Sequence, residues 1–140
     1  MHSTLLAPVI TLVLWTLVMC VWLYATRIPA IRRNRVPLEP HQTKEAFNAQ
    51  LPIEVRWKAD NYNHLMEQPT IFYAAVLALA LAGGDTAFHV NLAWLYVGLR
   101  IVHSLIQATV NVIMLRFAVF ILASMVLAVL SISAAMVIYS

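Results

Sequence analysis

The sequence predicts an all-α integral membrane protein, folded as one domain over residues 1–140 that forms a bundle of four transmembrane helices. Two observations carry this prediction. Hydrophobic residues make up 62% of the chain and charged residues only 11%, whereas a soluble domain carries about 25% charged residues. The hydrophobic residues also gather into four runs, each long enough to cross the ~30 Å hydrocarbon core of a bilayer as a helix.

The first predicted span covers residues 5–26 and contains no charged residue. No basic segment precedes it and no small-residue cleavage site is evident before Arg27, so we expect a retained span and not a cleaved signal peptide. The single cysteine, Cys20, excludes an intrachain disulfide. Its apolar surroundings favour an inert thiol over a reactive one.

A basic loop is predicted over about residues 27–60. Its positive residues are Arg27, Arg32, Arg33, Arg35, Lys44, Arg56 and Lys58, and its acidic residues are Glu39, Glu45, Glu54 and Asp60. By the positive-inside rule the loop is cytoplasmic, which places both chain termini on the outer side. We expect Pro29, Pro37, Pro40 and Pro52 to interrupt any long helix before Ile53.

The other three spans are predicted at about residues 65–82, 90–111 and 117–139, with the helix of the second span beginning near Ile53. Gly83, Gly84 and Asp85 predict a short outer turn. A tight inner connection then places Arg116 at the cytoplasmic interface. The net charge of +3 arises largely from the basic loop, which favours a role in membrane topology and argues against a nucleic-acid partner.

A polar stripe runs along the third span. It consists of Tyr96, Arg100, His103, Gln107 and Asn111, whose spacing on a helix places them within an arc of about 80°. A charge near the bilayer midplane costs at least ~2.5–3.5 kcal/mol unless it faces a partner or a wet cavity. We therefore expect the stripe to face protein.

A second polar face is predicted on the preceding helix, where Asn63, His64 and Glu67 lie close together. Arg100 is the natural partner for Glu67, since a bare carboxylate inside the membrane needs a cation or hydrogen-bond donors. The alternative interpretation is that an Arg100–Glu67 pair is a purely structural contact that fixes the register of the two helices. Pro69 removes a hydrogen bond from this helix, so we expect a bend there.

Arg116 has two interpretations. An arginine that flanks a span is usually an interfacial anchor. Arg116 also follows Arg100 on the side where the two polar faces open, and a cationic cleft there would attract an anionic ligand and lower the pKa of a thiol. His103 is more often a hydrogen-bonded helix residue than a ligand. No residues have metal-ligand spacing, so we expect no metal site.

These residues resemble those of a known family. The run from Asp60 to Tyr73, DNYNHLMEQPTIFY, is similar to the second-helix signature of the MAPEG superfamily, the membrane-associated proteins in eicosanoid and glutathione metabolism. The third-helix residues Arg100 and His103, followed by Asn111 and Arg116, resemble its next signature. The resemblance covers essentially the whole chain and is closest to bacterial members, which implies a bacterial inner-membrane location if the source is bacterial.

The resemblance implies a homotrimer of four-helix bundles with glutathione, a co-substrate, bound at each subunit interface near the cytoplasmic face. It implies that Arg116 stabilises the glutathione thiolate as the catalytic residue. The remaining site residues would shape and support the pocket: Asn63, His64, Glu67, Arg100, His103, Gln107 and Asn111. The chain departs from the family pattern at His64 and Gln107, where asparagine and tyrosine are expected, and Asp60 and Asn63 replace arginines.

The leading functional prediction is therefore a membrane-bound glutathione transferase or peroxidase that acts on lipophilic electrophiles, with the lipid bilayer, the electrophile and its own copies as partners. The alternative is a non-enzymatic membrane module that binds lipid or a small amphiphile, and the missing basic ligands favour it somewhat. A small drug/proton antiporter is a third class, but it normally requires an acid deep in the first span, and residues 5–26 contain none.

Overall fold

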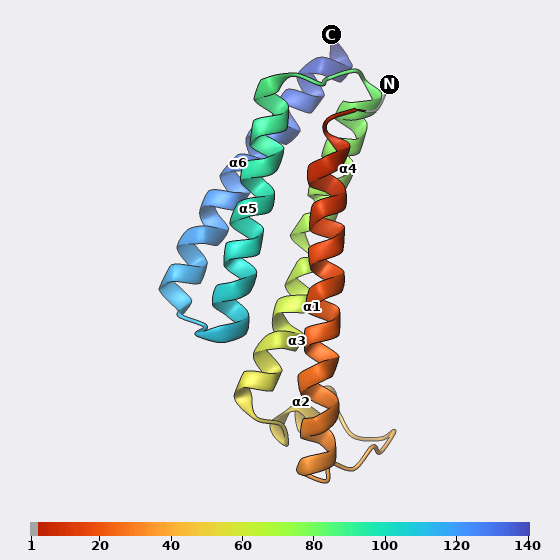
Figure 1. The fold of residues 1–140 in the computed structure, drawn as a ribbon, viewed down its shortest axis with the longest axis vertical. Coiled ribbons are helices and arrows are strands. Elements are labelled where there is room, and N and C mark those ends of the chain that lie inside the picture. The colour runs from red at the N-terminus through yellow and green to blue at the C-terminus, as the bar shows by residue number, and fades with distance from the viewer. Residues whose placement is uncertain (1–2) are drawn as a thin grey trace.

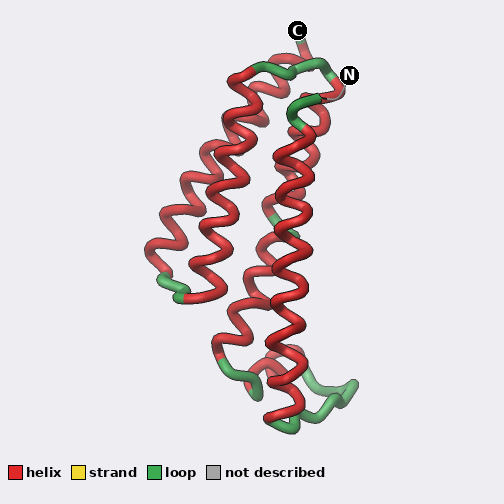
Figure 2. Tube along the Cα trace, in the orientation of Figure 1, coloured by secondary structure: helices red, strands yellow, loops and turns green. Residues whose placement is uncertain are grey.

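The computed structural model describes residues 3–140, and within this part every regular element is an α-helix. The helices are α1 (Leu6–Arg33), α2 (Lys44–Ala49), α3 (Ile53–Leu65), α4 (Gln68–Leu81), α5 (Ala87–Thr109) and α6 (Ile113–Tyr139). Figure 1 shows long helices packed side by side, with the chain termini at one end and the α2 region at the other. The connections between helices are confined to the two ends and to one break between α3 and α4 (Figure 2).

Three helical segments of the described chain are long and apolar enough to cross a membrane. They are Leu6–Arg33, Ile53–Leu81 and Ile113–Tyr139, so the protein is a multi-pass membrane protein. α5 has 23 residues, long enough to span, but its buried polar stripe lowers its hydropathy. α5 packs against α6, α1 and α3 (Figure 1). Since α5 is not among the three apolar segments, the fourth span remains a prediction.

The core lies where α1, α4, α5 and α6 face one another. Fully buried side chains fill it from every one of these helices, among them Leu12, Met19, Phe72, Tyr96 and Leu130. Phe72 and Tyr96 stack with ring centroids 4.5 Å apart. Many large apolar side chains remain exposed on the outer surface, which is the pattern of a bundle immersed in lipid and the reverse of a soluble protein.

The prediction that Pro29 interrupts the first helix is wrong, because α1 continues through Pro29 to Arg33. A proline inside a helix removes one hydrogen bond but does not have to end the helix when packing supports it. That support comes from a small second core, in which Ala30, Val36 and Leu51 pack together. The basic loop is thereby folded back against the end of α1.

Residues with a positive φ follow the ends of α4 and α5. Gly83 has a positive φ of 74°, and the Gly84 N–H donates to the Leu79 carbonyl oxygen, which ends α4 where the glycine pair predicts a turn. The α5–α6 connection spans only residues 110–112. Asn111 there has a φ of 49°, so it lies outside the helix; its predicted place on the helical stripe is therefore wrong.

Candidate functional site

A cavity of about 280 Å³ opens between the α3–α4 junction, α5 and the start of α6. It lies in the half of the bundle that contains the α5–α6 connection, toward the end that carries the basic loop (Figure 1). Both polar faces predicted from the sequence contribute to it, and α6 supplies most of its apolar wall. The lining residues are His64, Glu67, Gln68, Arg100, His103, Ile113, Arg116, Phe117 and Phe120.

The polar stripe of α5 is buried against protein, as predicted. Tyr96, Arg100, His103 and Gln107 are at most 3% exposed. Gln107 lies outside the cavity lining but supports it, because its Oε1 is 3.0 Å from Nδ1 of His64. The His64 and His103 rings face each other across the helix pair with centroids 6.3 Å apart.

The α3–α4 junction provides the polar floor of the cavity. α3 ends at Leu65 and α4 begins at Gln68, with Pro69 in the first turn of α4. The predicted bend at Pro69 is therefore present as a complete break in the helix. A break leaves backbone groups without helical partners, and such groups are tolerated at membrane depth only where protein or a cavity covers them.

Arg100 covers this break. Its guanidinium donates to the backbone carbonyl oxygen of His64 at 3.4 Å, so a buried cation meets a carbonyl from the end of α3. The helix C-terminus carries a partial negative charge, which favours a cation there. Arg100 thus has a structural role that the sequence did not indicate, because the break could not be located from the sequence.

The expected Arg100–Glu67 ion pair is not formed in residues 3–140. Arg100 contacts the His64 carbonyl, while the Glu67 side chain is exposed and lines the same cavity without a direct bond to the guanidinium. Glu67 is the residue at the break, with φ −95° and ψ −95°. This backbone conformation turns its side chain away from the position that a continuous helix would give it.

Arg116 is held in the cavity wall by the turn before α6. Its Nη1 donates to Oδ1 of Asn111 at 2.6 Å, and the Arg116 side chain lines the cavity while remaining partly exposed. Two of the nine chain arginines and lysines therefore meet at this cavity. Two cations and an open mouth make the cavity suitable for an anionic group.

Two lining residues also have unsatisfied polar atoms. Nε of Arg100 and Nδ1 of His103 are buried without a hydrogen-bond partner in the described structure. A buried polar group without a partner costs about 1–3 kcal/mol. Both residues line the cavity.

Three predicted site residues do not line the cavity: Asn63, which is exposed on α3, Gln107, which contacts His64, and Asn111, which accepts from Arg116. Gln68 lines the cavity but was not predicted. It accepts from Tyr96 Oη at 3.1 Å and donates to Oγ of Ser124 at 2.7 Å, so it joins α4, α5 and α6. Gln68 follows His64 by four residues, so helical spacing alone places it next to the polar face.

No group of three or more histidine, cysteine, aspartate or glutamate residues in the described chain is arranged to hold a metal ion.

Comparison with known proteins gives one match. The model of the MAPEG family matches residues 5–136, which includes every residue of the cavity lining. Searches of curated proteins and of solved structures return no match.

Proposed function

Because the chain belongs to the MAPEG family, we propose that it is a membrane-bound, glutathione-dependent transferase or peroxidase that acts on lipophilic electrophiles. The observation that supports this proposal best is the meeting of Arg100 and Arg116 in one cavity beside two histidines. Glutathione carries carboxylates and amides, which match the cations and the unpartnered buried atoms of the lining.

The proposed chemistry requires a thiolate. Glutathione supplies the thiol when bound, and a nearby cation favours its deprotonation because the thiolate is the nucleophilic form. Arg116 is the candidate for this role, since its guanidinium is partly exposed at the cavity wall and is oriented by Asn111. Arg100, buried and bonded to the protein backbone, would instead neutralise a carboxylate and hold the cavity in shape.

The apolar wall of the cavity suits the second substrate. Ile113, Phe117 and Phe120 line the cavity and are also exposed to the surroundings of α6. A lipophilic electrophile dissolved in the bilayer would therefore reach the thiolate from the lipid side without crossing water. We further propose that the chain forms a homotrimer, as the family resemblance implies, with its basic loop in the cytoplasm.

Substitution of Arg116 tests the catalytic assignment. We expect Arg116→Ala to reduce conjugation of a chlorinated nitrobenzene with glutathione to background, since the thiolate loses its cation, while the melting temperature in detergent stays within about 2 °C. Arg32→Ala, which removes a cation from the exposed end of α1, is the matched control and should retain full turnover. Unchanged turnover in Arg116→Ala would remove this residue from the mechanism.

The alternative function is a non-enzymatic membrane module that binds lipid or a small amphiphile. The specific observation in its favour is that three of the lining residues, Ile113, Phe117 and Phe120, are apolar. Calorimetric titration with glutathione, with and without an added electrophile, separates the two functions. Heat of binding that is unchanged by the electrophile and accompanied by no product would support a binding module over an enzyme.

A further inference from the structure

The side chains of His64 and Gln107 meet beside the cavity, and the proposed chemistry assigns this contact no role. His64 lies at the end of α3 and Gln107 near the end of α5, with Nδ1 of the histidine 3.0 Å from Oε1 of the glutamine. Because Gln107 is buried, water does not compete for this bond. Both positions depart from the family pattern, and the structure places these two departures in contact.

The bond to Gln107 fixes the tautomer of His64. An amide oxygen can only accept a hydrogen bond, so Nδ1 of His64 carries the hydrogen and Nε2 of the neutral ring has a free lone pair. His64 is partly exposed and lines the cavity, whereas Gln107 lies outside the lining. The ring therefore directs Nδ1 toward protein and leaves the Nε2 side for the cavity. No hydrogen bond to Nε2 is formed within residues 3–140.

Charged groups of both signs share the cavity with His64. Glu67 lines it from the α3–α4 junction, Arg100 from α5 and Arg116 from the start of α6. If a proton moves from a ligand to His64, the Glu67 carboxylate stabilises the imidazolium and the two arginines stabilise the anion left behind. The arginines also repel the imidazolium, which favours loss of the proton to water at the open mouth.

His103 is less suited to this task than His64, although the two rings lie only 6.3 Å apart. His103 is 3% exposed, and its Nδ1 is buried without a partner in the described structure. A proton acceptor has to return its proton to water in every cycle, so it needs access to water. The partly exposed His64 has this access.

We propose that His64 is the general base of the reaction, an inference that rests on the proposed function. Nε2 of His64 takes the proton of the glutathione thiol: the S–H bond breaks, its electron pair stays on sulfur, and a thiolate and an imidazolium result. With a chlorinated nitrobenzene, a carbon–sulfur bond then forms and chloride leaves with the electron pair of the broken carbon–chlorine bond. The imidazolium gives its proton to water, so His64 is regenerated.

Stopped-flow ultraviolet absorbance of the thiolate tests this role. We expect His64→Asn to slow thiolate formation about a hundredfold near neutral pH, since a positioned base contributes typically 10²–10⁴-fold. The final absorbance should be retained, because Arg116 and not His64 sets the equilibrium. The deficit should shrink at alkaline pH, where hydroxide takes the proton, and added imidazole should restore part of the rate.

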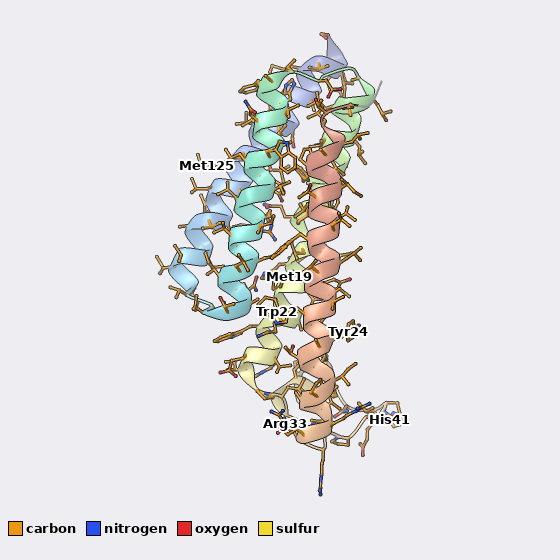
Figure 3. All side chains as sticks on the ribbon, in the orientation of Figure 1. Met19, Trp22, Tyr24, Arg33, His41 and Met125 are labelled. Atoms are coloured by element: carbon orange, nitrogen blue, oxygen red, sulfur yellow. The ribbon has the colours of Figure 1, made fainter. Side chains whose placement is uncertain are left out.

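His41→Asn is the matched control. His41 is exposed in the loop that follows α1, beyond the α5–α6 connection (Figure 3), so this variant should form the thiolate at the wild-type rate. A wild-type rate in His64→Asn would overturn the role of His64 and leave the proposed function intact. A rate lowered equally at every pH, with no rescue by imidazole, would assign His64 a structural role and overturn the proposal. If wild type binds no glutathione, the proposed function fails and this inference fails with it.

Nitrogen-15 NMR of the ligand-free protein with labelled histidine tests the tautomer without glutathione. We expect the His64 ring, assigned by loss of its signals in His64→Asn, to carry its hydrogen on Nδ1. His89, whose Nδ1 lies 2.8 Å from the Gly84 carbonyl oxygen, is an internal reference for this tautomer. Gln107→Leu should move the His64 hydrogen from Nδ1 toward Nε2 and slow thiolate formation. A His64 hydrogen on Nε2 in wild type would overturn the proposal whatever the kinetics.

Discussion

At the scale of single residues, the cavity depends on Asn111 as much as on the arginine beside it. Asn111 adopts a left-handed conformation, with φ 49°, and its side chain accepts from Arg116 at 2.6 Å. Asparagine tolerates this conformation better than most residues because its short polar side chain can bond locally. Asn111 therefore both closes the α5–α6 turn and orients the proposed catalytic guanidinium.

Two substitutions separate these roles of Asn111. Asn111→Gly keeps the permitted backbone but loses a hydrogen bond to a charged group, which is worth about 1.5–3 kcal/mol, so we expect the ultraviolet absorbance of bound thiolate and kcat to fall about tenfold or more and the melting temperature to fall modestly. Asn111→Ala should lower the melting temperature further, since alanine pays roughly 1–2 kcal/mol for a left-handed conformation. Wild-type kinetics in Asn111→Gly would show that Asn111 does not position Arg116.

Arg100 and Glu67 differ in how much each supports the fold. Arg100 is 1% exposed and caps the break at the His64 carbonyl, whereas Glu67 is exposed. We expect Arg100→Leu to lower the melting temperature in detergent by several degrees and Glu67→Gln to change it little. Equal destabilisation by the two variants would contradict this expectation and would support the Arg100–Glu67 ion pair that the sequence predicts.

Residue patterns in the sequence predict half of this site well. The helical spacing of Tyr96, Arg100, His103 and Gln107 correctly places them on one buried face, because a continuous helix has a fixed period. The prediction includes Asn63, which is exposed, and omits Gln68, which lies immediately after the break between α3 and α4. The break there changes the rotation of everything that follows, and its exact position depends on tertiary contacts such as that of Arg100.

At the scale of elements, the end of the bundle that contains the start of α1 and the α4–α5 turn is held together by Asp85. The Asp85 carboxylate in the α4–α5 turn accepts from Ser3 Oγ at 2.8 Å, from Thr4 Oγ1 at 2.9 Å and from the Leu5 N–H at 3.2 Å. These bonds join the start of α1 to the turn that follows α4. A carboxylate near the N-terminus of a helix also interacts favourably with the helix dipole.

This contact predicts a pH dependence. The Ser3 hydroxyl, followed by the other donors, holds the pKa of Asp85 below its ordinary value of 3.8, so the stabilising contribution is present above pH 3.8 and is lost as the pH falls through the lower, folded-state pKa. We expect wild type to melt at a higher temperature than Asp85→Asn at pH 6, and the difference to shrink below about pH 4. A difference that is constant from pH 6 to pH 3 would contradict this assignment.

The helix boundaries show which elements the sequence can and cannot define. The start at Ile53 and the turn at Gly83 and Gly84 are confirmed, because proline and glycine act there through local geometry. Pro29 was expected to act in the same way, but the contacts of Ala30 with Val36 and Leu51 keep α1 helical beyond it. Proline and glycine therefore predict helix boundaries correctly where no tertiary contact opposes their local effect.

At the scale of the whole molecule, both chain termini lie at one end of the bundle, and the basic loop and the α5–α6 connection lie toward the other (Figure 1). This arrangement requires an even number of crossings and therefore favours α5 as a fourth span. The hydrophobic composition correctly predicts a multi-pass membrane protein, whereas the number of spans and the side of the membrane on which the basic loop lies stay predictions. The proposed trimer does not follow from physical patterns in the sequence, because a lipid-facing and a subunit-facing apolar surface have the same composition.

Cysteine labelling tests the proposed topology. In a Cys20→Ser background, we expect His41→Cys in the basic loop to react with a membrane-impermeant maleimide only after the cells are opened. Ser140→Cys at the other end of the bundle should react in intact cells. The Cys20→Ser chain without a new cysteine is the control and should not react; the reverse pattern for the two positions would invert the topology.

The interruption between α3 and α4 makes the cavity adjustable. α3 and α4 are joined by Met66 and Glu67, and the Glu67 backbone angles of −95° and −95° belong to neither helix. A modest rotation at this joint would swing α4, with Gln68, toward or away from α5 without changing any side chain. A different angle at this joint would change the size of the cavity without any change in the residues that line it.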